Sequence, residues 1–324
     1  MVDKILDQRI SIITGGARGI GKAISESLAK EGCKVIIIDP GYTIDGNFDE
    51  KNIAEKTAEE ISNKYNVETL AITKDISIEK DMQNSIELIM KKFNSIDIVV
   101  NNAAILKDGF IFKYALNDWK KVIDTNLTGA FNLISQTSKI MKEQSKKDSN
   151  YTNGRIINVI STAGIWGNFG QAAYASAKSG LIGLTRVAAL DLQRLGITCN
   201  AIAPFASTRV TESINPQNEA QEKYKKSALK VEAKYIGDLT AFLASNQGKK
   251  YSGQIFGVRA KEVFLFNQSR PMYNFIRKSN ESNKDLEEGF KNYFDKNLTA
   301  IETDLEAFSS EPVIEWQHRN ELWL

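Results

Sequence analysis

Short apolar runs alternate with amphipathic segments through the first 260 residues, and this alternation constrains the fold more than any other feature. The runs rich in isoleucine and valine lie at 9–14, 34–39, 67–75, 97–103, 154–161, 197–203 and 253–258. Segments with helical spacing separate them, at 19–32, 52–65, 79–93, 118–143, 172–195 and about 234–245. Near-continuous apolar strands joined by helices are typical of a parallel sheet covered on both faces. We therefore expect an α/β fold with a doubly wound parallel sheet of about seven strands.

The chain divides at about residue 260 into a catalytic domain, 1–260, and a C-terminal extension, 261–324. The extension opens with the apolar run EVFLFNQ (262–268), which would add a further strand, and then turns polar. It ends with Trp316 and Trp323, which we expect to dock it on the domain, on a neighbouring subunit or over the mouth of the site.

Composition excludes several classes of protein. The net charge is +2 and no block of like charges occurs, which argues against a nucleic-acid partner. No apolar run is long enough to span a membrane, and the charged N-terminus lacks the apolar core of a signal peptide. Cys33 and Cys199 are the only cysteines, and with a single histidine they predict buried thiols and no metal site. We expect a cytoplasmic location.

The segment TGGARGIG (14–21) lies between the first expected strand and the first expected helix. Glycines let the backbone approach phosphates closely, and a helix N-terminus presents unpaired N–H groups and a partial positive charge. Asp39 ends the next expected strand, where an acid binds the ribose hydroxyls of a dinucleotide. The pattern predicts a Rossmann-type dinucleotide site.

Tyr174 and Lys178 are one helical turn apart and therefore face the same side of their helix. The only histidine, His318, lies near the C-terminus, so a proton carrier must be sought elsewhere. A phenol has a pKa near 10, and we expect the Lys178 ammonium and the positive nicotinamide ring to lower that of Tyr174. Tyr174 would then act as general base on an alcohol while hydride passes to the coenzyme.

These motifs together resemble the short-chain dehydrogenase/reductase family. The glycine spacing is T-G-x-x-x-G-I-G rather than G-x-G-x-x-G, and NNAA (101–104) and PFAST (204–208) match family motifs, with Ala104 and Phe205 replacing glycines. The resemblance implies a catalytic tetrad of Asn126, Ser161, Tyr174 and Lys178. In it, Ser161 bonds the substrate oxygen, Lys178 bonds the nicotinamide ribose, and Asn126 holds a water that links Lys178 to solvent.

The resemblance also implies a set of coenzyme contacts. Asp75 would meet the adenine amino group and Thr208 the carboxamide. The full set is Thr14, Gly15, Arg18, Gly19, Ile20, Gly21, Asp39, Asp75, Ile76, Asn102, Ala103, Tyr174, Lys178, Pro204 and Thr208. We expect NAD rather than NADP, because the Asp39 carboxylate would repel a 2′-phosphate. Arg18 argues for NADP, since relatives hold the 2′-phosphate with a basic residue there; otherwise it is a solvated side chain.

Finer resemblance points to the (3R)-hydroxyacyl-CoA dehydrogenase segment of multifunctional β-oxidation enzymes and to related stand-alone bacterial enzymes. It covers about residues 5–275 and includes NNAAILKDGFIFK (101–113), GIWGNFGQAAYASAK (164–178) and GVRAKEVFLFNQSRP (257–271). It implies oxidation of a 3-hydroxyacyl-CoA to the 3-oxoacyl-CoA. Arg209, Lys223, Lys226 and Lys230 lie in a polar segment, 205–231, that would close on the CoA phosphates as a lid, or would simply be a solvated lysine face.

Other functions stay open on the sequence alone. The main alternative is a 3-oxoacyl-carrier-protein reductase, which usually prefers NADP, or another alcohol, steroid or sugar dehydrogenase of the family. A protein that senses NAD without turnover is a non-enzymatic alternative, and the extension would serve as an interaction module in another. The family pairs the helices at 118–143 and 172–195 across two-fold axes, so we expect a homodimer or homotetramer.

Overall fold

The computed structural model describes residues 4–148, 151, 154–208, 211–212, 214–277 and 283–315. Its centre is one eight-stranded sheet in the order β3-β2-β1-β4-β5-β6-β7-β8. The strands are β1 (Ile10–Thr14), β2 (Lys34–Ile38), β3 (Thr69–Ile72), β4 (Ile98–Asn101), β5 (Arg155–Val159), β6 (Thr198–Phe205), β7 (Ile255–Arg259) and β8 (Glu262–Phe266). All neighbours pair in parallel except β7 and β8. The doubly wound parallel sheet is confirmed, with β8 as an eighth, antiparallel strand.

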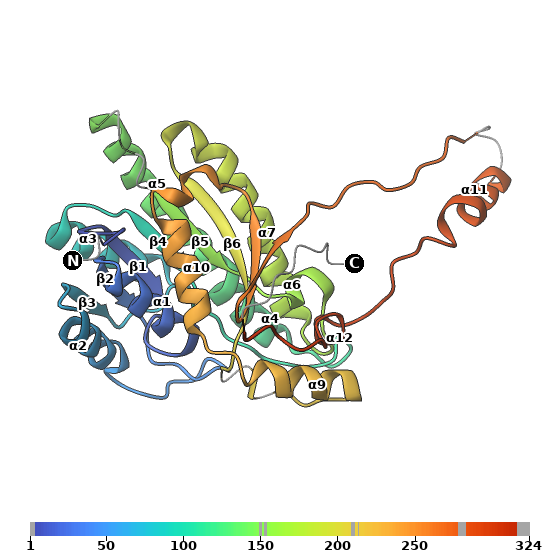
Figure 1. The fold of residues 1–324 in the computed structure, drawn as a ribbon, viewed down its shortest axis with the longest axis horizontal. Helices are drawn as coiled ribbons and strands as arrows, with labels where there is room; N and C mark the ends of the chain where they lie inside the picture. The colour runs from blue at the N-terminus through green and yellow to red at the C-terminus, as the bar shows by residue number, and fades with distance from the viewer. Residues whose placement is uncertain are drawn as a thin grey trace.

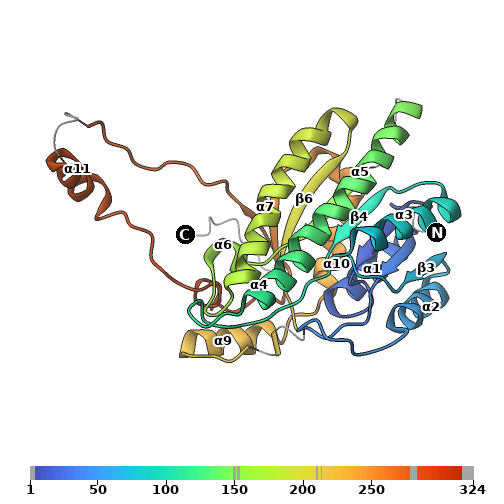
Figure 2. The same cartoon turned by 180° about the vertical axis from the view of Figure 1, so that it is seen from behind.

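Helices cover both faces of the sheet (Figures 1 and 2). One face is covered by α1 (Gly19–Lys30), α2 (Ile53–Tyr65) and α10 (Lys234–Ala244). The other is covered by α3 (Glu79–Phe93), α5 (Gly129–Lys147) and α7 (Ala172–Leu192). The segment expected as one helix at 118–143 is α4 (Leu116–Ile123), the π-helical η1 (Asp124–Thr128) and α5. Among the described residues, no helix is long and apolar enough to cross a membrane.

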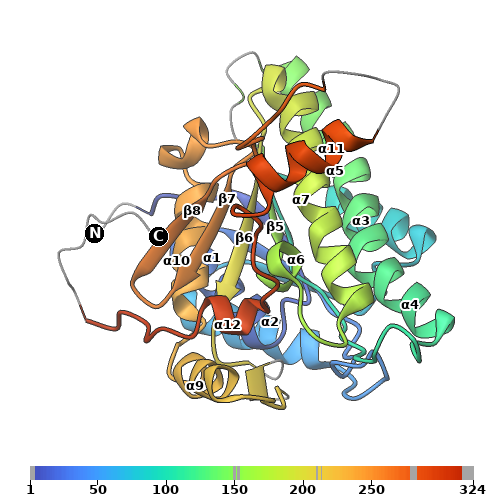
Figure 3. The same cartoon turned by 90° about the vertical axis from the view of Figure 1, so that its right-hand side faces the viewer.

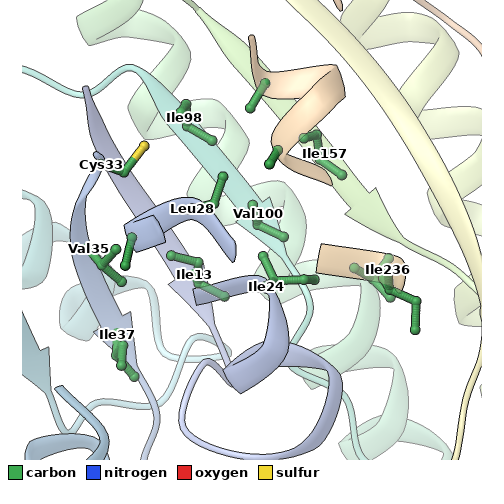
Figure 4. Close-up of a cluster of buried hydrophobic side chains, with 14 of the residues drawn as sticks. Ile13, Ile24, Leu28, Cys33, Val35, Ile37, Ile98, Val100, Ile157 and Ile236 are labelled. Atoms are coloured by element: carbon green, nitrogen blue, oxygen red, sulfur yellow. The ribbon is translucent and has the colours of Figure 1, made fainter. Parts of the chain in front are cut away.

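The core explains why the central strands are mostly apolar on both faces. Ile13, Ile37 and Val100 point to the α1 and α10 side of the sheet, where they meet Ile24 and Ile236 (Figure 4). Their neighbours along the same strands, including Ile12, Ile36 and Val99, pack on the opposite face. Side chains alternate along a strand, so burial of both faces favours apolar residues at successive positions, and the polar exceptions, such as Ser11 and Asn158, are themselves buried. Cys33 and Cys199 are free and buried within this packing, as the sequence predicts.

The C-terminal extension has three parts, which differ in how they lie relative to the sheet. Strand β8 pairs with β7 and confirms the strand expected at 262–268. Residues 267–277 then run out from the body and residues 283–302 run back to it, with α11 (Lys284–Gly289) and the π-helical η4 (Phe290–Phe294) at the far end (Figures 1 and 2). Residues 303–308, the strap, contain α12 (Asp304–Ala307) and lie against the body beside α9 (Glu219–Ala228) (Figure 3). The domain boundary at residue 260 stays a prediction.

An aromatic cluster fixes the strap to the body. Phe308 lies 4.6 Å from Phe205 and 5.2 Å from Trp166, measured between ring centroids, and also contacts Phe264 and Phe266 of β8. Phe308 is buried. It therefore anchors the strap; Trp316 and Trp323, which the sequence predicts to dock the extension, lie outside the described residues.

Candidate functional site

A cleft of about 430 Å³ opens at the carboxyl ends of the strands, next to the point between β1 and β4 where the strand order reverses. Ligands of doubly wound sheets bind at this topological switch point. The predicted coenzyme contacts, apart from Thr14, all line the cleft. The structure therefore brings together residues from six separate stretches of the sequence, although their roles toward a coenzyme stay predictions.

Thr14 lies beneath the cleft rather than in its wall. Its buried hydroxyl accepts hydrogen bonds from the backbone N–H groups of Asn102 and Ala103, at 3.0 and 3.1 Å. The Asn102 side chain in turn donates to the carbonyls of Thr14 and Gly15, at 3.0 and 3.1 Å. These bonds join the turn after β1 to the turn after β4, so Thr14 supports the cleft from below.

The glycine turn has the shape that a pyrophosphate requires. A Cβ on Gly21 would lie 2.0 Å from the Gly15 carbonyl oxygen, so only glycine lets α1 start this close to β1. Gly19 has a φ of +51° and a Cβ there would meet nothing within 4 Å, which leaves open space at the helix N-terminus. The N-cap side chain, Arg18, makes no capping bond to the first turn. The first N–H groups of α1 and this space together fit a phosphate pair.

Asp39 and Arg18 have different surroundings in the adenosine end of the cleft. Asp39 is buried and its two oxygens accept from the N–H groups of Ala17 and Gly41, at 3.3 and 2.9 Å. Arg18 donates to the Asp49 carboxylate at 2.6 Å and to the Tyr42 carbonyl at 2.5 Å. The carboxylate is therefore fixed in the cleft wall, while the guanidinium is held by the insertion at 40–51.

The four predicted catalytic residues gather at the other end. Lys178 of α7 is buried, donates to the Val159 carbonyl at 2.7 Å, and lies 5.7 Å from the centroid of the Tyr174 ring. A hydrogen bond joins the Ser161 and Tyr174 side chains. Asn126 lies in the π-helical turn η1, and its amide exchanges two bonds with the backbone of Ile105, at 2.8 and 2.9 Å. Its neighbour Thr125, rather than Asn126 itself, lines the cleft.

The electrostatics of Tyr174 differ from the sequence-based expectation. Burial raises the pKa of Tyr174 to about 12; the Ser161 hydrogen bond lowers it, and the charges of Asp304 and Asp108 raise it further. Burial also lowers the pKa of Lys178 to about 8. The expectation that the protein acidifies this phenol is wrong for the chain alone, because desolvation by burial is the largest effect on its pKa. The part due to a positive nicotinamide ring stays a prediction.

A smaller chamber of about 100 Å³ adjoins the cleft and shares Tyr174 with it. Its polar side chains come from the segment after β5, from α9 and from the strap, and include Ser161, Asn168, Gln171, Thr208, Tyr224 and Asp304. Burial and the charge of Asp304 raise the pKa of Tyr224, and burial raises the pKa of Asp304 to about 6. A group held here would lie against the Tyr174 and Ser161 hydroxyls.

Sequence reasoning missed two parts of the site. The insertion at 40–51 lines the cleft through Pro40, Tyr42, Thr43 and Ile44, and is tied down where Leu106 N–H donates to Ile44 at 2.7 Å. The strap contributes Asp304 and Leu305 to the chamber. The glycines at 41 and 46, both with positive φ, were the sequence signal for a folded insertion. No motif marked Asp304.

The lysines of the expected lid face solvent. Lys226 pairs with Glu222 at 2.7 Å and Lys230 with Glu311 at 3.7 Å, and Lys223 is exposed. The side of α9 that packs on the body instead presents Gln221, Ser227 and Ala228. Among the described residues that line the cleft and the chamber, none of these lysines occurs. This geometry favours the solvated face; Arg209 lies outside the described residues.

Comparison with known proteins agrees with this geometry. Residues 9–219 match the family model described as short chain dehydrogenase. The chain is 35% identical over 257 residues to a 3-oxoacyl-[acyl-carrier-protein] reductase of Synechocystis sp., covering 78% of this chain and 96% of that protein. It is 37% identical to the corresponding reductase of Staphylococcus epidermidis, over 76% and 96% of the two chains. A crystal structure of a short chain dehydrogenase from Mycobacterium avium superposes with a TM-score of 0.76 at 26% identity, covering 89% of this chain and 95% of that one.

Proposed function

Because the chain belongs to the short-chain dehydrogenase family and is an NAD(P)-dependent oxidoreductase acting on CH–OH groups, we propose that it reduces the ketone of a 3-oxoacyl thioester with NADH. This corrects the emphasis of the sequence-based expectation, which put oxidation of a 3-hydroxyacyl-CoA first. The two are the same reaction in opposite directions, on different carriers. The curated relatives at 35–37% identity are 3-oxoacyl thioester reductases, which supports the reductive reading.

The observation on which the proposal depends is the state of Tyr174. This phenol lines both the cleft and the chamber, and its pKa of about 12 keeps it protonated at neutral pH. A protonated phenol is a proton donor, and a ketone that accepts hydride must gain a proton on its oxygen. A phenolate base would serve the oxidation instead.

The residues of this chain then have distinct tasks. When bound, the reduced nicotinamide supplies the hydride. Tyr174 donates its proton to the ketone oxygen, and Ser161, which is hydrogen-bonded to Tyr174, holds that oxygen in line. Lys178, fixed by the Val159 carbonyl, keeps a positive charge beside the phenol and stabilises the phenolate that forms. Asn126 holds the backbone of Ile105 at the cleft wall.

The coenzyme we propose is NADH rather than NADPH. Asp39 is fixed at the end of β2 by two backbone N–H groups, so its charge cannot move away from a 2′-phosphate. Arg18, the cation that would bind such a phosphate, is engaged by Asp49 and by the Tyr42 carbonyl. Recruiting it would break both bonds.

A coenzyme and carrier screen tests the proposal. We would measure kcat/KM for 3-oxobutanoyl groups on N-acetylcysteamine, on CoA and on an acyl carrier protein, each with NADH and with NADPH. We expect NADH-dependent reduction of the thioester and a preference for one carrier, which decides between the CoA and carrier-protein readings. Reduction of none of the three thioesters would overturn the substrate class, and a preference for NADPH would overturn the coenzyme. Cytoplasmic location and a dimer or tetramer stay predictions.

A further inference from the structure

The insertion at 40–51 crosses the carboxyl edge of the sheet from one helical face to the other. On the α1 side, the Arg18 guanidinium donates to the Asp49 carboxylate at 2.6 Å. On the far side, the Gly46 carbonyl accepts from the Lys121 ammonium of α4 at 2.8 Å. Helix α4 contacts α7, which covers the face opposite to α1. The insertion is therefore anchored on both sides of the edge at which the cleft opens.

The cleft lies between this crossing segment and the ends of the strands. Gly15 and Asn102, which directly follow β1 and β4, line it from the sheet. Thr43 and Ile44 line it from the insertion. Ile44 is fixed there because its carbonyl accepts from the Leu106 N–H at 2.7 Å. A molecule that fills the cleft would therefore be enclosed between the strand ends and the insertion.

The insertion is a compact loop with a narrow neck. The backbone N–H groups of Asp49 and Glu50 donate to the Gly41 carbonyl at 3.0 and 3.1 Å, which closes the neck. The Thr43 N–H donates to the Asn47 carbonyl at 2.7 Å, which closes the turn at the far end. A loop that is closed by its own hydrogen bonds can move as one unit about its neck.

The far end of the insertion, residues 44–46, is its tip, and the contacts that hold it on the body are individually weak. Two are the hydrogen bonds from Lys121 and Leu106. A third is the packing of Gly46 on Ile105, so close that a Cβ on Gly46 would lie 3.0 Å from the Ile105 Cδ1. Lys121 is exposed, so water competes for its bond, and the net contribution of one such bond is small. The tip can therefore detach while the neck and the sheet keep their structure.

We propose that the insertion at 40–51 is the gate of the coenzyme cleft: the coenzyme binds beneath it, and enters or leaves only after the tip detaches from Lys121 and Leu106. The inference goes beyond the proposed thioester reduction and does not depend on it, because it requires only the nicotinamide coenzyme of the family. Among the described residues that line the cleft, Lys121 does not occur. It is a positioning residue, which reaches the coenzyme only through the insertion.

Stopped-flow fluorescence of NADH tests the gate without any ketone. Association is followed on mixing the enzyme with NADH, and dissociation on displacing bound NADH with excess NAD⁺. Lys121→Met removes the ammonium that holds the tip. The bond that it breaks joins two parts of the protein, so the gate should open more often with or without coenzyme. We expect the association and dissociation rate constants each to rise about 3- to 10-fold, while their ratio, Kd, changes by less than about twofold.

Control variants separate the gate from a general effect of the substitution. Lys120→Met removes the same charge from the neighbouring exposed position of α4, and should change neither rate constant. Gly46→Ala crowds Ile105 and so disturbs the same contact from the other side; it should act as Lys121→Met does. Replacing residues 43–47 by two glycines removes the tip and should give the fastest association. The two ends of that stretch are hydrogen-bonded to one another, so two residues can join them.

The two rate constants together decide the inference. Faster dissociation with unchanged association would show that the insertion only adds contacts to the coenzyme, and would overturn the gate. Rate constants within twofold of wild type in Lys121→Met, Gly46→Ala and the shortened variant alike would overturn it as well. A rise of both rate constants in the shortened variant alone would support the gate and assign its closure to the bond between Ile44 and Leu106.

Failure of the proposed function is recognised separately. An enzyme that reduces no 3-oxobutanoyl thioester but shows the expected rise of both rate constants keeps the gate and loses only its assigned substrate. Should the enzyme prefer NADPH, the same measurements are made with NADPH and displacement by NADP⁺, with the same expected changes. Binding of neither reduced coenzyme would overturn the gate together with the proposed reduction.

Discussion

The coenzyme cleft and the chamber beside it share Tyr174 but are built in different ways. The cleft is formed mostly by turns that directly follow β1, β2, β3, β4 and β6, so most of its residues lie within a few positions of a strand end; Thr125, Tyr174 and Lys178 are helical. The chamber combines the segment after β5 with α9 and with a strap more than 100 residues further along the chain, since Thr162 bonds Asp304. A site made of strand ends is fixed by the sheet, whereas one made of distant segments depends on their docking. The following experiments test that difference.

The largest expected effect is on Tyr174, which lines both regions. Tyr174→Phe keeps the ring in its packing but removes the proton donor, so we expect kcat for ketone reduction to fall by about 10²- to 10⁴-fold. The affinity for NADH, measured by fluorescence titration, should change by less than about threefold because the cleft keeps its shape. An equally large loss of NADH binding would show that the two regions are not separable.

Removing the anchor of the strap should damage the chamber and spare the cleft. Phe308→Ala leaves a cavity among Phe205, Trp166 and Phe264, and we expect the free energy of unfolding to fall by about 3–5 kcal/mol. KM for the ketone should rise while the dissociation constant of NADH stays constant. Ile314→Ala, at an exposed position of the same extension, is the matched control and should change neither. Weaker NADH binding in Phe308→Ala alone would contradict the separation.

Asp304 should make the stability of the chamber depend on pH. Its pKa is about 6 in the folded protein and 3.8 in the unfolded reference, so the folded state holds the proton more strongly. The stabilisation is therefore complete below about pH 4 and is lost as pH rises through about 6, by about 3 kcal/mol. Asp304→Asn should lack this dependence in denaturant titrations between pH 4 and 7. A wild-type stability that rises steeply over the same interval and is matched by the variant would contradict it.

The smallest effect we expect is on the choice between NADH and NADPH, and it should follow from changes in the cleft alone. Asp39→Ala removes the fixed carboxylate, and we expect the ratio of kcat/KM for NADH to that for NADPH to fall about tenfold. Asp49→Asn, which weakens the pair with Arg18, should lower the ratio further when added to the first change. Neither variant should alter the preference among the ketones. A changed ketone preference would show that the cleft and the chamber influence one another.

The sequence-based predictions were more accurate for the cleft than for the chamber. The glycine turn and Asp39 were found because each stands at a fixed offset from an apolar run, and parallel strands deliver their ends to one edge. Asp75 and the residues after β4 were found only through the family resemblance. No sequence pattern in the insertion at 40–51 shows that Ile44 meets Leu106, so its place in the cleft wall could not be predicted. Phe308 anchors the strap although no sequence pattern marks it, and the docking role predicted for Trp316 and Trp323 lies outside the described residues. The pKa of Tyr174 was predicted in the wrong direction because burial is a property of the folded chain.

The sequence by itself determined the sheet, its order of elements and the identity of the residues at the coenzyme cleft, since these depend on periodicity and on local turn chemistry. Only the tertiary structure decided what surrounds the phenol. Desolvation and the charge of Asp304 act through space, and the strap reaches Tyr174 by packing an aromatic side chain far from it in the sequence. Such contacts have no period and no fixed spacing, and they therefore leave no pattern in a single sequence.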